Sequence, residues 1–360
     1  MDLLLRVLVF AAGLVLVIYV SLSAVRTFVL PRASPEFLSR LLFLAIRFFF
    51  DLRAKKARSY EERDQIMALY APISLILLIP FWLTLILIGY MGMFWAIGVR
   101  PWSAAFLASG SALFTLGFVP ATDLPTGFLE FSEATIGLIL VALLIAYLPT
   151  MYSAFSRREA AVALLEVRAG TPPSAVEMIL RFQRIHGLDR LTPQWTAWEN
   201  WFVELDESHT SLAALVFFRS PQPQHSWITA AGTVLDAAAL VDSTIDVPRE
   251  AEAQLCLRAG YIALRRIADF FDIPYNPNPQ PGDPISISRD EFDAVYDRLA
   301  EEGVPLKPDR DEAWRNFAGW RVNYDAVLLA LARLIMAPYA PWSSDRSLPF
   351  RRGLFRRRRR

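Results

Sequence analysis

The chain has 360 residues, 54% of them hydrophobic, and its 37 basic and 36 acidic side chains leave a formal net charge of +1. This small value hides three regions, because residues 1–158 carry +4, residues 159–345 carry −11 and residues 346–360 carry +8. A single cysteine, Cys256, excludes an intrachain disulfide framework and a cysteine-based zinc site, and we expect it to be a small buried apolar residue. The length and the uneven charge favour a membrane part followed by a soluble domain.

Residues 1–30 predict a membrane-spanning helix. Leu3–Val25 is apolar apart from Arg6, and about 20 apolar residues are enough to cross a bilayer. A signal peptide is the alternative, but no cleavage site of small residues followed by a polar start is present. We therefore expect a helix that remains in the membrane.

Residues 31–68 predict an amphipathic helix at the membrane surface and a basic linker. Arg40 and Arg47 interrupt an apolar pattern at helical spacing, which favours an interfacial helix over a spanning one. Five basic residues lie between Asp51 and Asp64, so the positive-inside rule predicts that this linker is cytoplasmic and that the N-terminus is outside.

Residues 69–158 predict a pore module. Leu69–Val99 has no charge and Phe131–Phe155 is a second apolar span, which ends at a pair of arginines. Between them, Trp102–Phe114 follows Pro101, which suits the first turn of a helix, but this stretch is too short to cross a bilayer. We expect a re-entrant pore helix, which is possible only where the irregular backbone after it lines water or is buried in protein.

The short stretch leads into Thr115, Leu116, Gly117 and Phe118. This run resembles the Thr-Val-Gly-Tyr-Gly selectivity filter of potassium channels, in which backbone carbonyls replace the hydration shell of the ion. The resemblance implies that the four carbonyls bind a permeant K⁺ or another monovalent cation, with the negative end of the pore helix directed at it. A buried glycine turn in an ordinary membrane bundle is the alternative, and the order of the helices around the run favours the pore.

The run departs from the filter pattern after Phe118. Val119 replaces the second glycine and precedes Pro120. A β-branched residue resists positive φ, and a residue before proline is held extended, so the outermost carbonyl ring cannot form in the usual way. We expect cation conduction, whereas strict selectivity for K⁺ does not follow.

Two residues of the second span are candidate flexure points for gating. Gly137 and Pro149 qualify because kinks in helices usually occur at glycine or proline. Packing of a small residue against a neighbouring helix explains Gly137 equally well. No run of regularly spaced arginines lies within a predicted span, so we expect no voltage sensor.

Residues 159–345 predict a compact helical bundle in the cytoplasm. Ser174-x-x-Glu177 and Ser288-x-x-Glu291 match the capping box, and Thr192-Pro193 joins a cap to a first-turn proline. Helices are expected at about residues 174–186, 193–204, 208–218, 225–242, 249–272, 288–302 and 309–336.

This domain contains no motif of catalysis, so we expect neither an enzyme nor a bound cofactor or metal. Nucleotide-binding glycine patterns are missing, and His186, His209 and His225 are too scattered for a metal site. Ser208 adjoins His209 and several acids, but a helix N-cap at Ser208 explains that cluster better than catalysis does.

Two further clusters are expected to pack rather than to bind a ligand. For Arg321 and Tyr324 we favour buried ion pairing over a ligand site. The other cluster is an aromatic stripe at helical spacing, which consists of Trp195, Trp198, Trp201 and Phe202.

The tail, residues 346–360, is strongly basic. Its arginines could bind anionic lipid headgroups of the inner leaflet, at about 1 kcal/mol per residue near the surface, while pairing with the acidic domain and plain disorder are alternatives. Nucleic-acid binding would also need a folded reader and is not expected. The candidate lipid-binding residues are Arg351, Arg352, Arg356, Arg357, Arg358, Arg359 and Arg360.

Stretches along most of the chain carry a wider resemblance: Thr27–Arg32, Leu69–Pro72, Phe114–Phe118, Ala146–Glu159, Glu207–Thr210, Leu215–Pro221 and Trp320–Asp325. In these the chain resembles bacterial ion-channel-domain proteins with a large helical cytosolic part, often described as two-pore-domain potassium channel family proteins. The resemblance implies a potassium-channel-like pore in the plasma membrane, although only one filter-like run is present here.

One filter-like run per chain and a ring of four carbonyls imply a homotetramer with cyclic symmetry. The first hypothesis is a passive cation channel whose cytosolic domain regulates gating. A membrane-anchored cytosolic sensor or enzyme with a non-conducting pore-like segment is the alternative. A scaffold that docks partners on its acidic domain is a third possibility.

Overall fold

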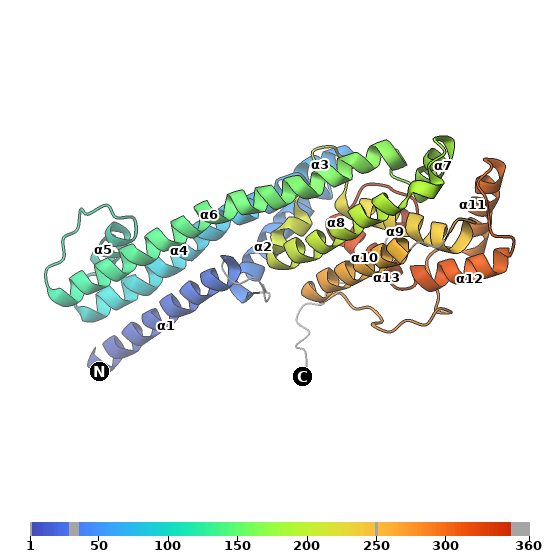
Figure 1. Ribbon diagram of the computed structural model, residues 1–360. Helices are drawn as coiled ribbons and strands as arrows, with labels where there is room; N and C mark the ends of the chain where they lie inside the picture. The colour runs from blue at the N-terminus through green and yellow to red at the C-terminus, as the bar shows by residue number, and fades with distance from the viewer. Residues whose placement is uncertain (1, 29–35, 249–250, 347–360) are drawn as a thin grey trace. The chain divides into compact units, whose positions relative to one another are not determined.

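The computed structural model describes residues 2–28, 36–248 and 251–346. Within these ranges the chain is helical and forms no β-strand, apart from an isolated bridge between Ile245 and Leu306. The all-α part of the predicted fold class is therefore confirmed. The chain divides into two compact units, Met1–Ser153 and Ala154–Arg360, whose helices are labelled in Figure 1. A separate hydrophobic core forms in each unit.

Three helical stretches are long and apolar enough to span a membrane: Leu3–Phe28, Tyr60–Ile97 and Leu124–Ala169. They agree with the three predicted spans and indicate a membrane protein. The helices of this part of the chain are α1 (Asp2–Phe28), α2 (Phe37–Ala54), α3 (Tyr60–Ala68), α4 (Tyr70–Ile97), α5 (Trp102–Leu113) and α6 (Leu124–Ala169).

Helices α1 and α4 approach each other closely because glycines stand at their crossing. A Cβ atom on Gly13 would overlap the carbonyl oxygen of Gly89, and a Cβ on Gly89 would lie 2.7 Å from Cγ2 of Val17. Small residues of this kind let membrane helices gain van der Waals contact along their backbones. The same core contains the fully buried Trp82, whose ring meets Phe28 edge-on at 5.2 Å.

Helix α2 contains a buried arginine. Arg47 is 6% exposed and donates a hydrogen bond to Asp51, one turn later, at 2.7 Å. Its guanidinium also lies 5.2 Å from the centre of the Tyr70 ring of α4. These contacts compensate the charge of Arg47, while the position of α2 at the membrane surface stays a prediction.

Helix α5 matches the short helix that the sequence predicts. It begins at Trp102, after Pro101, and ends at Leu113. Its 12 residues are about 18 Å long at 1.5 Å per residue, which is shorter than the hydrocarbon core of a bilayer. In Figure 1, α5 and its flanking loops lie at the end of α4 near which α6 begins.

Helix α6 is much longer than the predicted span of residues 131–155. It begins at Leu124, where the carboxylate of Asp123 accepts a hydrogen bond from the N–H of Thr126 at 2.8 Å. This cap satisfies one of the free donors at the helix start. The helix then continues for 46 residues and ends at Ala169.

The second unit is a helical bundle, as the sequence predicts for residues 159–345. After the end of α6 its elements are α7 (Ala175–Arg184), η1 (Leu188–Arg190), α8 (Thr192–Ser211), η2 (Ala213–Phe217), α9 (Trp227–Thr244), α10 (Ala251–Phe270), α11 (Arg289–Glu301), α12 (Arg310–Arg321), α13 (Asp325–Ile335) and η3 (Ser344–Arg346).

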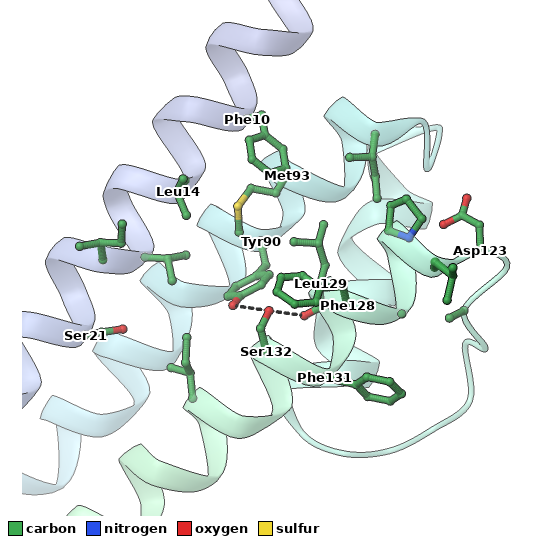
Figure 2. Close-up of a pocket in the computed structure, with 18 of the residues that line it drawn as sticks. Phe10, Leu14, Ser21, Tyr90, Met93, Asp123, Phe128, Leu129, Phe131 and Ser132 are labelled. Carbon is green, nitrogen blue, oxygen red and sulfur yellow. Dashed lines mark hydrogen bonds between the residues drawn. The ribbon is translucent and has the colours of Figure 1, made fainter.

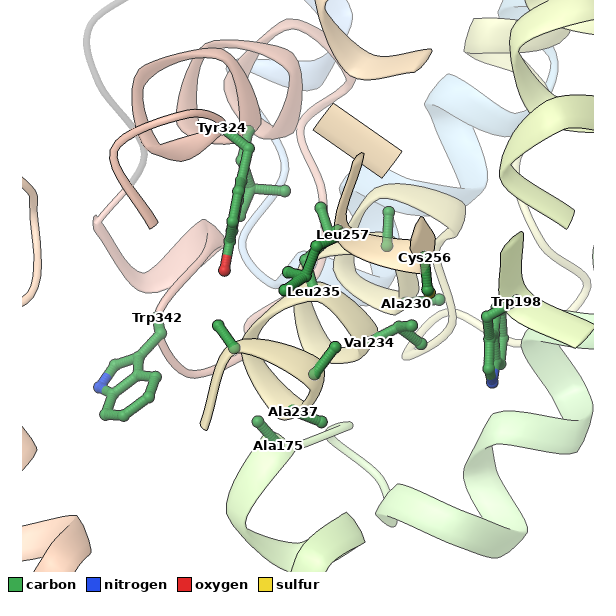
Figure 3. Close-up of a cluster of buried hydrophobic side chains, with 14 of the residues drawn as sticks. Ala175, Trp198, Ala230, Val234, Leu235, Ala237, Cys256, Leu257, Tyr324 and Trp342 are labelled. Carbon is green, nitrogen blue, oxygen red and sulfur yellow. The ribbon is translucent and has the colours of Figure 1, made fainter. Parts of the chain in front are cut away.

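The core of this bundle is built around α9, whose residues are all buried except Asp242. Figure 3 shows side chains from several other elements grouped around this helix, among them Leu257, Tyr324 and Trp342. The predicted aromatic stripe packs into this core, because Trp195, Trp198, Trp201 and Phe202 are buried, and so is Cys256.

Local capping follows the sequence at α11 but not within α8. Ser288 and Glu291 form a complete capping box at the start of α11. The predicted N-cap at Ser208 is wrong, because α8 runs through this position to Ser211. Its hydroxyl instead donates a hydrogen bond to the carbonyl of Glu204 at 2.6 Å, one turn earlier. Serine tolerates this helical position when its hydroxyl has such a carbonyl partner.

Candidate functional site

The filter-like segment, Thr115–Phe118, is irregular backbone that directly follows α5. All four residues are exposed in the single chain, with Leu116 at 63% and Phe118 at 56%. Large apolar side chains are exposed at many other positions of the first unit as well, among them Leu124, Phe128 and Phe131.

Ser111, in the last turn of α5, binds two N–H groups of this segment and that of Val119, the next residue. Its hydroxyl accepts hydrogen bonds from the N–H groups of Phe118 at 3.1 Å and Val119 at 3.2 Å. Its carbonyl oxygen accepts a third from the N–H of Leu116 at 2.8 Å. Ser111 is only 2% exposed, so these bonds fix the segment to the buried side of α5.

The carbonyl oxygens of the same segment are left free. No donor within residues 2–28, 36–248 and 251–346 gives a hydrogen bond to the carbonyl oxygens of residues 115–118. The backbone has positive φ at alternate residues, 53° at Thr115 and 69° at Gly117. The N–H groups that bind Ser111 face α5. The carbonyls of the segment have no such partner, and unpaired carbonyls need water or a cation.

The end of α5 is held against α6 by a glycine. A Cβ atom on Gly137 would lie 2.6 Å from the carbonyl oxygen of Leu113, which is closer than a real Cβ contact. This close approach gives Gly137 the packing role that the sequence allowed. Flexure at Gly137 and at Pro149, which lies inside α6, stays a prediction.

Helix α5 is also joined to both neighbouring helices by one hydroxyl. Ser109 Oγ lies 3.1 Å from the carbonyl oxygen of Leu87 in α4 and 2.6 Å from Oε1 of Glu133 in α6. Ser109 and Glu133 are completely buried. Glu133 is recognisable in the sequence as a candidate for such a contact, because an ionisable residue inside an apolar span is costly and usually has a role.

A separate cavity of about 1310 Å³ opens between α1, α4 and the first turns of α6 (Figure 2). Its lining is mainly apolar and includes none of residues 115–118. Figure 2 shows its main polar contact, in which the Tyr90 hydroxyl donates to Ser132 Oγ and Ser132 donates to the carbonyl of Leu129, both at 2.9 Å. The cavity could hold apolar groups but does not contribute to the filter-like segment.

In the second unit, Arg158 is a buried cation. The sequence predicts its position at the end of a span but not its burial. It is 4% exposed and donates to the carbonyls of Leu215 and Phe218, each at 2.8 Å. Its Nη1 also lies 3.2 Å from Nε2 of His209. Burial, and then the charge of Arg158, lower the pKa of His209 well below its usual range, so this imidazole is neutral.

The predicted buried ion pairing of Arg321 is confirmed. Arg321 is completely buried and contacts Asp236 at 2.5 Å and Asp325 at 2.7 Å. The Tyr324 hydroxyl donates to the same carboxylate of Asp236 at 2.8 Å, and Arg321 also donates to the carbonyl of Trp342. All of these partners belong to the core of the same unit. The network therefore stabilises the core and does not form a ligand site.

The remaining predicted sites give no further geometry. Among the residues that the structure describes, no group of three or more His, Cys, Asp or Glu side chains could hold a metal ion. The seven candidate lipid-binding arginines of the tail lie outside the described residues.

Comparison of the chain with protein-family models gave no match, and comparisons with curated proteins and with solved structures gave none either.

Proposed function

We propose that this chain is the subunit of a passive cation channel whose pore is lined by the carbonyls of Thr115, Leu116, Gly117 and Phe118. The observation that carries the proposal is the division of the backbone groups: the N–H groups of Leu116, Phe118 and Val119 bind Ser111, whereas no donor among the described residues binds the four successive carbonyls of residues 115–118. Carbonyl rings of this kind bind dehydrated K⁺ and similar cations. The C-terminal end of α5 adds its negative partial charge beside them.

One chain supplies only one side of such a pore, so four copies around a common axis are needed. The exposed side chains of Leu116 and Phe118 are consistent with contacts that form only in that assembly. The basic linker between Asp51 and Asp64 favours a plasma-membrane topology with the N-terminus outside and the helical bundle in the cytoplasm. There the bundle would regulate gating, and the basic tail would lie near anionic lipids.

The first test is ion flux into liposomes that contain the purified full-length protein, with K⁺ and Na⁺ gradients compared. Flux of either cation supports the proposal, and selectivity for K⁺ would show that the rings before Val119 are sufficient. Gly117→Ala is expected to abolish flux because an alanine resists the φ of 69° at this position. No flux of either cation would overturn the proposal and favour a membrane-anchored sensor or enzyme.

A second test changes the support of the segment and not the segment itself. Ser111→Ala removes the acceptor of two N–H groups, which costs about 2 kcal/mol and shifts the equilibrium between filter conformations about 30-fold. We expect flux to fall, or discrimination between K⁺ and Na⁺ to change, by about that factor. Ser103→Ala is the matched control, because Ser103 is an exposed serine of the same helix. Equal flux and equal selectivity in Ser111→Ala and Ser103→Ala would show that Ser111 does not support conduction.

A further inference from the structure

Three helices meet at the hydroxyl of one buried serine. Ser109 of α5 lies within hydrogen-bond distance of the carbonyl of Leu87 in α4 and of Glu133 in α6, at 3.1 and 2.6 Å. Ser109 and Glu133 are both 0% exposed, so no bulk water takes part. The protonation state of this site can therefore be worked out by counting donors and acceptors.

The serine hydroxyl carries one proton, whereas both of its neighbours are oxygen atoms. The carbonyl oxygen of Leu87 can only accept a hydrogen bond. If Ser109 donates to Leu87, the contact at 2.6 Å is a hydrogen bond only when Glu133 carries a proton and donates it. An ionised Glu133 would take the single proton of Ser109 and would leave the contact with the carbonyl of Leu87, at 3.1 Å, without a hydrogen bond.

The surroundings also disfavour a charged carboxylate. Among the described residues Glu133 forms no ion pair, and its second oxygen, Oε2, is buried without a hydrogen-bond partner. Two titratable groups lie near Glu133. One is Glu130, one turn earlier on α6, and the other is Tyr90 of α4, whose hydroxyl donates a hydrogen bond to Ser132 Oγ. Helix α5 contains no titratable residue. An unpaired carboxylate without a counter-charge is far more costly to bury than a neutral acid.

We infer that Glu133 is held as the neutral carboxylic acid and donates its proton to Ser109 Oγ, which in turn donates to the carbonyl of Leu87. Glu133 is then a positioning residue that joins α6 to α5 and α4. Ser109 lies two residues before Ser111, which binds the filter-like segment. The effect of Glu133 on conduction rests on the proposed function, whereas its protonation does not.

The first measurement reads protonation directly. Infrared difference spectra of the full-length protein in detergent at pH 7.5, wild type minus Glu133→Gln, are expected to contain the C=O stretch of a protonated carboxyl group. Glu130→Gln is the matched control, because this acid lies on the same helix. This variant keeps Glu133, so its spectrum minus that of Glu133→Gln is expected to contain the same band. Carboxylate bands in place of the protonated band would overturn the inference.

The second measurement reads the role in positioning. Glu133→Gln keeps a neutral donor of the same length, so flux and the thermal unfolding temperature are expected to stay at the wild-type level. Glu133→Met and Ser109→Ala each remove the bond, and we expect flux to fall about tenfold. The double variant is expected to lose no more than either single one, since both remove the same contact. Wild-type flux in Glu133→Met would overturn the positioning role.

The two proposals fail in different ways. A protonated-carboxyl band in a protein that conducts no cation would refute the channel and leave the neutral acid in place. Flux in the wild type together with carboxylate bands at Glu133 would support the channel and refute the neutral acid. Unfolding temperatures of the variants identify those that fail through misfolding, and Glu133→Gln keeps the test valid if Glu133→Met does not fold.

Discussion

His209 shows how a single buried residue can make stability depend on pH. Its ring is completely buried, and Nε2 lies 3.2 Å from the guanidinium of Arg158. Guanidinium groups only donate hydrogen bonds, so Nε2 accepts one and must be unprotonated. Protonation would replace this bond by repulsion between two buried cations.

We expect acid to destabilise the second unit through this residue. The pKa of His209 is lowered in the fold by burial and by Arg158, so below about pH 6.5 the unfolded chain binds a proton that the folded chain does not. Stability from this group is therefore complete above that pH and falls by about 1.4 kcal/mol per unit of pH below it. Thermal unfolding of the full-length protein at pH 7.5 and 5.5 measures the effect.

Two histidine variants separate this contribution from other titrating groups. His209→Gln cannot titrate and is expected to flatten the pH dependence, even if its stability at pH 7.5 is lower. His186→Gln changes an exposed histidine and is expected to keep the wild-type slope. An unchanged slope in His209→Gln would show that His209 is not the group responsible.

At this scale the sequence predicted residue roles only where nearby residues define them. The capping box of Ser288 and Glu291 was predictable because its two members lie three residues apart. Buried pairing of Arg321 was predictable in kind, but its partner Asp236 lies 85 residues earlier and no local pattern identifies it. Ser111 was missed because its role depends on how the chain folds back after α5.

At the scale of helices, the crossing of α1 and α4 depends on glycine. Gly13→Ala is expected to destabilise the first unit by about 1–3 kcal/mol, because the added methyl group would overlap the backbone of Gly89 and force the helices apart. Thermal unfolding in detergent, followed by tryptophan fluorescence, measures this loss.

Gly92→Ala provides the matched control on α4. A Cβ atom there would lie 3.5 Å from Cγ1 of Val9, which is ordinary van der Waals contact, and alanine favours a helix over glycine. We expect this variant to be as stable as the wild type or more stable. Equal losses in Gly13→Ala and Gly92→Ala would contradict the close crossing.

The bounds of the helices illustrate why apolar runs identify spans better than whole helices. Residues 131–155 were predicted from hydrophobicity alone, yet α6 begins earlier, at the cap of Asp123, and continues through the amphipathic stretch after Arg158. Neither extension is apolar throughout. The N-cap expected at Ser208 failed for a related reason, because hydrogen bonds within α8 and packing of its aromatic face continue the helix past that residue.

At the scale of the molecule, each unit has a hydrophobic core whose members come from one part of the chain. The core of the second unit extends from Val162 to Trp342, and that of the first unit from Val17 to Leu140. We therefore expect residues 154–346 to fold alone into a helical domain with one cooperative thermal transition, measured by circular dichroism.

Arg321→Ala tests whether that transition reports the native core. It leaves Asp236 and Asp325 without their partner, which costs about 3–5 kcal/mol, a large part of the stability of a domain. The variant fragment is expected to melt far below the unchanged fragment. A broad transition in both would show that the second unit needs the rest of the chain.

The sequence predicted the broad organisation because membrane spans and helix caps depend on residues that are close together in the sequence. Length and hydrophobicity identify α1, α4 and α6, and the break at Pro101 identifies α5. Assembly into a tetramer is proposed from the filter-like segment alone, because a ring of four carbonyls needs one segment from each of four copies.

Helix α6 has a mechanical consequence because of its length. Its 46 residues, at about 1.5 Å per residue, form a rod of about 69 Å, whereas the hydrocarbon core of a bilayer is about 30 Å thick. About 39 Å of this helix lies beyond the lipid tails if it crosses upright, and less if it crosses with a tilt. No loop interrupts α6 between its membrane part and its C-terminal end. A rotation of the membrane part is therefore either absorbed by bending at Pro149 or transmitted along the helix to that end.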